Sequence, residues 1–187
     1  MPTFIALLRG INVGTAKRLP MAELRALLTG LGYDGVTTLL NSGNAVFRAA
    51  QGTPQQHAAA ISAAIAGQLG LQVPVIVKTA KELSAIVQGN PFDAATLDPS
   101  QLLVAFVQAP AALAGLNALS AQVVPPEQCQ VGAHAAYLHC AHGILESQAA
   151  KALLGKSGKA GKSDAVTVTT RNWATVLKLQ ALAHACA

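Results

Sequence analysis

The chain has 187 residues, of which 52% are hydrophobic and only 11% are charged, so it can fill the core of one large domain or two small ones. Its formal net charge is +5 and its pI about 9.4, a balance that permits an anionic partner. Aromatic residues make up 4% of the chain, which excludes a binding surface built mainly on base stacking.

Three cysteines, Cys129, Cys140 and Cys186, are too few and odd in number for a disulfide framework and fit a reducing compartment. The apolar run Phe4–Leu8 is too short for a signal peptide, so we expect a cytoplasmic protein. The uncharged stretch 102–124 is interrupted by polar residues and by Pro110. We interpret it as strand, turn and helix rather than a membrane span, and expect no membrane partner.

The first 79 residues predict the order strand, helix, strand, strand, helix, strand. One helix begins at Pro20, carries leucines at i, i+3, i+4 and i+7, and ends at Gly32. The other begins with a capping box at Thr53 and ends at Gly70. Alternating or β-branched runs bounded by turn residues predict the strands: Thr3–Arg9, Gly35–Leu40, Ala45–Arg48 and Val73–Lys78.

A linking helix capped by Thr79 and Glu82 follows, and the order then repeats after residue 100. The predicted elements are a strand at Leu102–Gln108, a helix from Pro110, a hairpin of Gln128–Val131 with Ala135–Cys140, a helix at Leu145–Leu154, a strand at Ala165–Thr169 and a last helix from about Asn172 to Ala183. The fold class is therefore α+β, with two ferredoxin-like (βαββαβ) subdomains in tandem and a C-terminal helix. The predicted boundaries are 1–79, 80–100 and 101–187.

Two loops of the first subdomain are expected to converge. The first and second strands of this fold run parallel with the third between them, so loop 9–19 and hairpin 41–44 lie at one edge. That edge is rich in basic and amide side chains and in glycine amides that approach a ligand closely. The predicted ligand-binding residues here are Arg9, Gly10, Asn12, Gly14, Lys17, Asn41, Ser42 and Asn44.

The corresponding segment of the second subdomain is 155–164, which is rich in Gly, Ser and Lys. It lacks the spacing of a phosphate-binding P-loop, because Lys156 occupies the position of the first glycine and a strand, not a helix, is predicted next. A flexible basic loop is the better description.

Other groups of residues give weaker evidence for a functional site. The histidines and cysteines around His139 and Cys140 lack metal-ligand spacing, so no metal or other cofactor is expected. Cys140 is interpreted as a buried, inert thiol, and the scattered carboxylates leave any catalytic residue unknown. The run Thr169–Trp173 predicts a helix start with a threonine cap, Trp173 in the core, and Arg171 in the first turn, where it opposes the helix dipole. We therefore add Arg171 to the predicted ligand-binding residues.

Four segments together resemble one bacterial family, known as domain of unknown function 1697. They are Ala6–Gly14, the helix Met21–Leu28, the hairpin Asn41–Phe47 and the closing Thr170–Trp173. The resemblance implies a cytoplasmic α+β protein with two subdomains, and no established activity. It also implies that Asn172 belongs with Arg171 among the predicted ligand-binding residues. In this family a glycine is followed by a basic residue, a serine or threonine, and a lysine. Here Gly143 and Ser147 fit this pattern, but Glu146 and Gln148 replace the two basic residues.

The leading hypothesis is a protein that binds an anionic ligand, nucleic acid or a phosphorylated metabolite, at the edge formed by loop 9–19 and hairpin 41–44. One alternative is an enzyme acting on a small phosphorylated or carboxylated metabolite, with the same residues as a substrate clamp. A further alternative is a protein-interaction scaffold. The sequence leaves open whether the protein is an enzyme and what its oligomeric state is.

Overall fold

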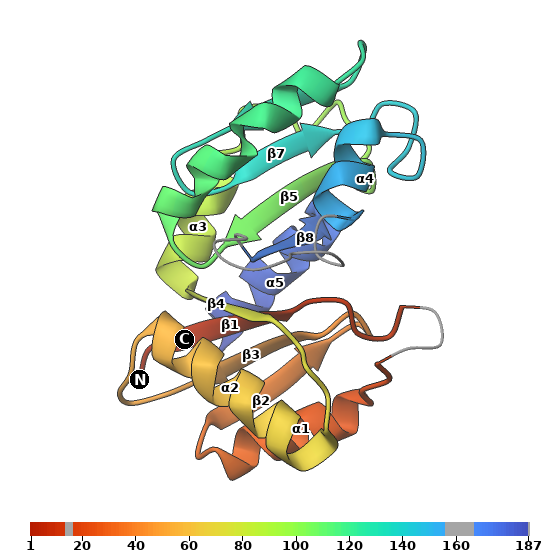
Figure 1. Ribbon diagram of the computed structural model, residues 1–187. Helices are drawn as coiled ribbons and strands as arrows, with labels where there is room; N and C mark the ends of the chain where they lie inside the picture. The colour runs from red at the N-terminus through yellow and green to blue at the C-terminus, as the bar shows by residue number, and fades with distance from the viewer. Residues whose placement is uncertain (14–16, 156–166, 187) are drawn as a thin grey trace. The chain divides into compact units, whose positions relative to one another are not determined.

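The computed structural model describes residues 1–13, 17–155 and 167–186. Contacts divide the chain into two compact units, Met1–Leu83 with Leu179–Ala187, and Ser84–Lys178. Each unit has one four-stranded antiparallel sheet with helices, so the fold is mixed α/β (Figure 1). The domain boundaries expected from the sequence stay predictions.

The first unit contains four strands and two helices that precede α3. Its sheet has the strand order β2-β3-β1-β4, and every neighbouring pair is antiparallel. The elements are β1 (Thr3–Leu8), α1 (Met21–Gly30), β2 (Asp34–Leu39), β3 (Asn44–Arg48), α2 (Pro54–Leu69), β4 (Val75–Thr79) and α3 (Ala80–Gln88).

Local sequence signals explain most of these boundaries. The capping box at Thr53 is present, with Gln56 as its partner, and Gly70 ends α2 in the left-handed conformation. Thr79 and Glu82 exchange the equivalent bonds ahead of α3. Pro20, predicted as the first helical residue, instead precedes α1, because its ψ of 138° is extended.

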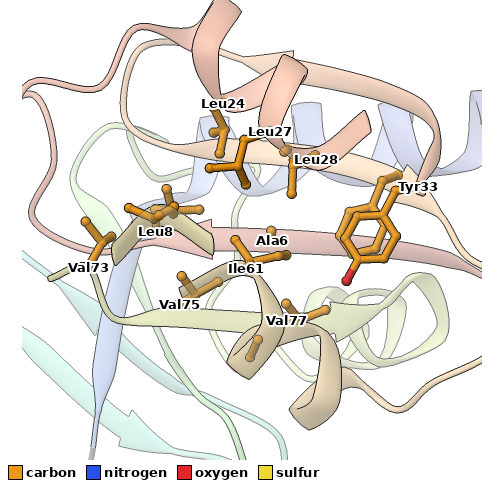
Figure 2. Packing of buried hydrophobic residues seen from close by; sticks show 14 of the residues in the cluster. Ala6, Leu8, Leu24, Leu27, Leu28, Tyr33, Ile61, Val73, Val75 and Val77 are labelled. Atoms are coloured by element: carbon orange, nitrogen blue, oxygen red, sulfur yellow. The ribbon is translucent and has the colours of Figure 1, made fainter. Parts of the chain in front are cut away.

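The main core of the first unit lies between one sheet face and helices α1 and α2 (Figure 2). Alternate residues of β1 point to this face, and leucines of α1 and isoleucines of α2 meet them. The residues that Figure 2 labels are Ala6, Leu8, Leu24, Leu27, Leu28, Tyr33, Ile61, Val73, Val75 and Val77.

The second unit has the strand order β6-β7-β5-β8. The helix predicted from Pro110 is a 3-10 helix whose leucines at 113, 116 and 119 are buried. The helix predicted from Leu145 begins three residues later, where Ser147 Oγ accepts the N–H of Ala150. The elements are β5 (Leu102–Val107), η1 (Pro110–Gln122), β6 (Gln128–Val131), β7 (Ala136–His139), α4 (Gln148–Gly155), β8 (Val168–Asn172) and α5 (Trp173–Ala185).

The segment before the last helix differs from the prediction. Arg171 does not lie in a first helical turn; it lies in β8, opposite Val104 of β5. The helix cap is Asn172, whose Oδ1 accepts the N–H of Thr175, and not a threonine. Trp173 is buried as predicted. The start of the strand predicted at 165–169 lies outside the described residues.

Within the described ranges, no helix has both the length and the apolar character needed to cross a bilayer.

A buried histidine sits at the centre of an aromatic cluster in the first unit. His57 of α2 shares a hydrogen bond of 2.9 Å between its Nδ1 and the Tyr33 hydroxyl, and Phe4 and Phe47 pack against its ring. A Cβ at Gly52, which has a φ of +103°, would lie 2.9 Å from Nε2. Burial lowers the pKa of His57, and a hydrogen bond from the ring to the Gln51 backbone carbonyl offsets part of that effect.

We predict that this cluster makes the protein less stable in mild acid. Because the folded state disfavours protonated His57, the unfolded state binds more protons below about pH 6.5, and the free energy of unfolding falls as pH drops. Urea denaturation between pH 7.5 and 5 measures this slope. The slope should flatten in His57→Gln and persist in His134→Gln, which alters an exposed histidine. Equal slopes in both variants would contradict the assignment.

Candidate functional site

The side chain of Asn12 joins three segments of the chain. Its Nδ2 donates to the carbonyl oxygens of Leu19 at 2.9 Å and Asn41 at 2.7 Å, and its Oδ1 accepts the Leu19 N–H at 2.9 Å. Its backbone N–H donates to the Lys17 carbonyl. The loop after β1, the approach to α1 and the β2–β3 turn are therefore held together, as the topology predicted. We call residues 9–13, 17–19 and 40–44 the loop–hairpin edge.

A close backbone approach fixes the hairpin side of this edge. The Leu8 N–H donates to the Gly43 carbonyl at 2.8 Å. A Cβ at Gly43 would lie 2.7 Å from Leu8 Cβ and from Ile11 Cδ1, so only glycine fits. Buried Asn44 braces the turn, because its Nδ2 donates to the Leu39 carbonyl and to Ser42 Oγ.

The segment entering β4 also reaches the edge. Lys17 Nζ donates to the Gln72 carbonyl at 2.8 Å, and the Arg9 N–H donates to the Pro74 carbonyl. Sequence reasoning missed this contribution, although the topology contained the signal. Because β4 is antiparallel to β1, its amino end lies beside the end of β1.

Three basic side chains occur on the edge. Arg9 is half-buried, and burial lowers its pKa, whereas Lys17 and Arg18 are exposed. Gly10 is exposed, with a φ of +66°. Gly14, which was also predicted to bind the ligand, lies outside the described residues.

The edge has unusual backbone and surface features that the sequence did not predict. Among described non-glycine residues, positive φ is found at Asn12 (55°), Lys17 (52°) and Leu40 (57°), all on this edge. The left-handed conformation is uncommon for leucine and costs about 1 kcal/mol or more. Leu40 is also exposed, as is Val13 beside Asn12. Strained residues concentrate at functional sites, which favours a functional role for the edge.

The other two predicted ligand-binding residues belong to the second unit. Arg171 is buried and donates to Thr169 Oγ1 at 3.0 Å and to the Thr170 carbonyl at 2.7 Å. Burial lowers the pKa of Arg171 to about 10. Asn172 caps α5, so both side chains have structural partners within β8 and α5.

The buried thiol of the second unit is unreactive. Burial raises the pKa of Cys140 to about 11, and a hydrogen bond from Ser147 offsets part of this rise. A thiolate is the reactive form, so Cys140 is not a nucleophile at neutral pH. In the described part of the chain, no three His, Cys, Asp or Glu side chains are placed to hold a metal ion.

We predict that Asn12→Ala lowers the free energy of unfolding by about 2–3 kcal/mol, because three side-chain hydrogen bonds are lost. Hydrogen exchange at the Leu19 amide, a donor to Asn12, should accelerate. Asn12→Gly accepts the left-handed backbone but loses the same bonds, so a similar loss there would identify the bonds as the cause. Unchanged exchange in Asn12→Ala would show that this side chain does not hold the edge.

We predict that Gly43→Ala costs about 2 kcal/mol or more, because the added methyl collides with Leu8 Cβ and the residue must keep a φ of +77°. Gly67→Ala is the control: it lies within α2 with nothing within 4 Å of the added methyl, and should stabilise by about 0.5–1 kcal/mol. Thermal and urea denaturation of both variants test this contrast. Equal stability of the two variants would refute the close approach.

Comparison with known proteins places the chain in one family. A search of curated proteins finds no match. Among solved structures, the chain is similar to the conserved bacterial protein SP0830 from Streptococcus pneumoniae, with 20% identity, a TM-score of 0.77, and coverage of 97% of this chain and 98% of that one. At this identity the likeness extends to the fold alone. The model for the protein family of unknown function DUF1697 matches residues 1–137, and the chain therefore belongs to this family.

Proposed function

We propose that the loop–hairpin edge binds a phosphate-bearing anion, either nucleic acid or a phosphorylated metabolite. The observation that carries this proposal is the bond of 2.7 Å from Asn12 Nδ2 to the Asn41 carbonyl. It joins the basic loop to the hairpin, so that donors from distant parts of the sequence stand side by side. A preformed set of donors binds an anion without the entropy cost of assembling it.

The charge distribution supports an anionic ligand. The first unit has seven Lys or Arg and three Asp or Glu, and so holds four of the five net positive charges. No acidic residue occurs before Glu23 or between Gly35 and Lys81. The segments that form the edge therefore contain basic residues and no carboxylate. The electrostatic field of these basic residues favours anions.

Backbone and side-chain donors add to this field. The start of α1 comes three residues after Arg18, and no side chain caps it, so the positive end of its dipole supports anion binding. Lys17 Nζ uses one N–H for the Gln72 carbonyl, and an ammonium group has three.

The residue types favour binding over catalysis. The edge contains no Asp, Glu, His or Cys, so it offers no carboxylate or imidazole as a general base and no thiol as a nucleophile. We therefore place an anion-binding role ahead of the enzymatic alternative.

We also propose that each unit is ferredoxin-like. The β-α-β-β-α-β order of the first unit, with strand order β2-β3-β1-β4, supports this assignment. The second unit has the same succession with a 3-10 helix as its first helix, and the equivalent order β6-β7-β5-β8 supports the tandem arrangement.

We predict salt-dependent binding that charge reversal at the edge weakens. Fluorescence anisotropy with a labelled oligonucleotide and thermal shift with inorganic pyrophosphate separate the two ligand classes. With about three phosphate contacts, the logarithm of the oligonucleotide affinity should fall with the logarithm of salt at a slope of roughly −2 to −3. Arg18→Glu should weaken binding of the ligand at least tenfold, since it replaces attraction by repulsion.

Lys81→Glu is the matched control, because it makes the same charge change at the other end of the sheet. Thr79, two residues earlier, pairs with Phe4 near the start of β1, whereas the edge follows the end of β1. Binding lost equally in both variants would indicate a nonspecific response to net charge. Absence of binding to every anionic probe at low salt would refute the proposal.

A further inference from the structure

Two exposed apolar side chains lie among the basic residues of the loop–hairpin edge. Val13 is 73% exposed and Leu40 is 51% exposed. Phosphate binding alone has no use for either one. Leu40 is held there in a strained left-handed conformation, at a turn position where glycine or asparagine would be relaxed.

The Asn12 side chain brings these two residues close to the charges. Val13 follows Asn12 in sequence, and Leu40 precedes Asn41, whose carbonyl accepts from Asn12. Arg18 lies between Lys17 and Leu19, which are both hydrogen-bonded to Asn12. The edge thus presents two aliphatic tips from a loop and a turn, flanked by cationic side chains.

Nucleic acid makes poor use of these tips. Single strands bind through aromatic stacking, and the edge has no aromatic residue. The sheet face opposite α1 and α2 is not open to stacking by nucleobases either, because Ile5, Leu7 and Val46 are fully buried. An aliphatic wedge in a duplex must unstack neighbouring base pairs, and only a large wrapped protein surface offsets that cost. The three basic side chains of the edge do not supply that surface.

We infer that the phosphate-bearing partner of the loop–hairpin edge is an anionic phospholipid surface, with Val13 and Leu40 inserted among the headgroups and the bases on their phosphates. This inference rests on the proposed function. It runs against the sequence-based expectation of no membrane partner, which considered a membrane span. Apolar tips flanked by bases suit this interface, because aliphatic groups enter the acyl boundary while cations meet the negative surface potential.

The bound state is reversible and sensitive to salt. Each Lys or Arg near an anionic membrane strengthens binding by about fivefold, and two aliphatic tips together contribute about tenfold. Such a contact recruits the protein to a surface without anchoring it permanently.

Co-sedimentation with vesicles tests the inference on the full chain. The vesicles are phosphatidylcholine alone and phosphatidylcholine mixed with phosphatidylglycerol. The protein should bind the mixed vesicles only, and Arg18→Glu should weaken binding by about thirtyfold, since it changes the charge by two. The double variant Val13→Ser with Leu40→Asn keeps every charge and should weaken binding about tenfold. Asn accepts the left-handed backbone at position 40, so this variant stays folded.

The oligonucleotide of the preceding experiment is measured on the same variants. Vesicle binding that is unchanged in the double variant overturns the inference, because charge alone would then explain it. Binding to the oligonucleotide but not to mixed vesicles overturns the inference and leaves the proposed function standing. Loss of binding to every anionic probe overturns both.

Discussion

The arrangement of the first unit around its basic loop depends on one side chain, that of Asn12. Its amide satisfies the carbonyls of Leu19 and Asn41 and the Leu19 N–H at once, because an amide group both donates and accepts hydrogen bonds. Asparagine also tolerates the left-handed backbone that the turn requires there. The backbone conformation and the hydrogen bonds thus both favour asparagine at this position. The bonds of Asn12 hold the exposed residues of the edge in place, although those residues are not part of the core.

The packing beneath the edge makes this arrangement rigid. Gly43 lies directly against Leu8 and Ile11, both buried in the helix-facing core. The turn therefore sits on the end of β1 and cannot move away without breaking a backbone hydrogen bond to Leu8. A rigid support of this kind lets Leu40 keep a strained conformation at the surface, where a free turn would relax it. Strain that the structure maintains at an exposed, basic site is consistent with a binding role.

Many helix boundaries and the position of the loop–hairpin edge could be predicted from the sequence. The capping boxes at Thr53 and Thr79 and the meeting of loop 9–19 with hairpin 41–44 follow from spacing and strand order. Tertiary contacts decided the rest. Pairing with β5 extends the Val- and Thr-rich strand through Arg171, where local rules predicted a helix turn. The leucines of η1 recur every three residues, a period that fits a 3-10 helix better than the predicted α-helix. Nothing in the sequence indicated that Leu40 would adopt the left-handed conformation.

We propose that the loop–hairpin edge, and not strands β5 to β8, contacts an anionic partner. Amide NMR spectra recorded during titration with nanodiscs containing phosphatidylglycerol test it most directly, because every backbone N–H reports separately. The account predicts that signals of residues 9–13, 17–19 and 40–44 change first, while those of β5 to β8 stay in place. Changes concentrated in the second unit, or none at saturating nanodiscs and in parallel titrations with oligonucleotide and pyrophosphate, would contradict it.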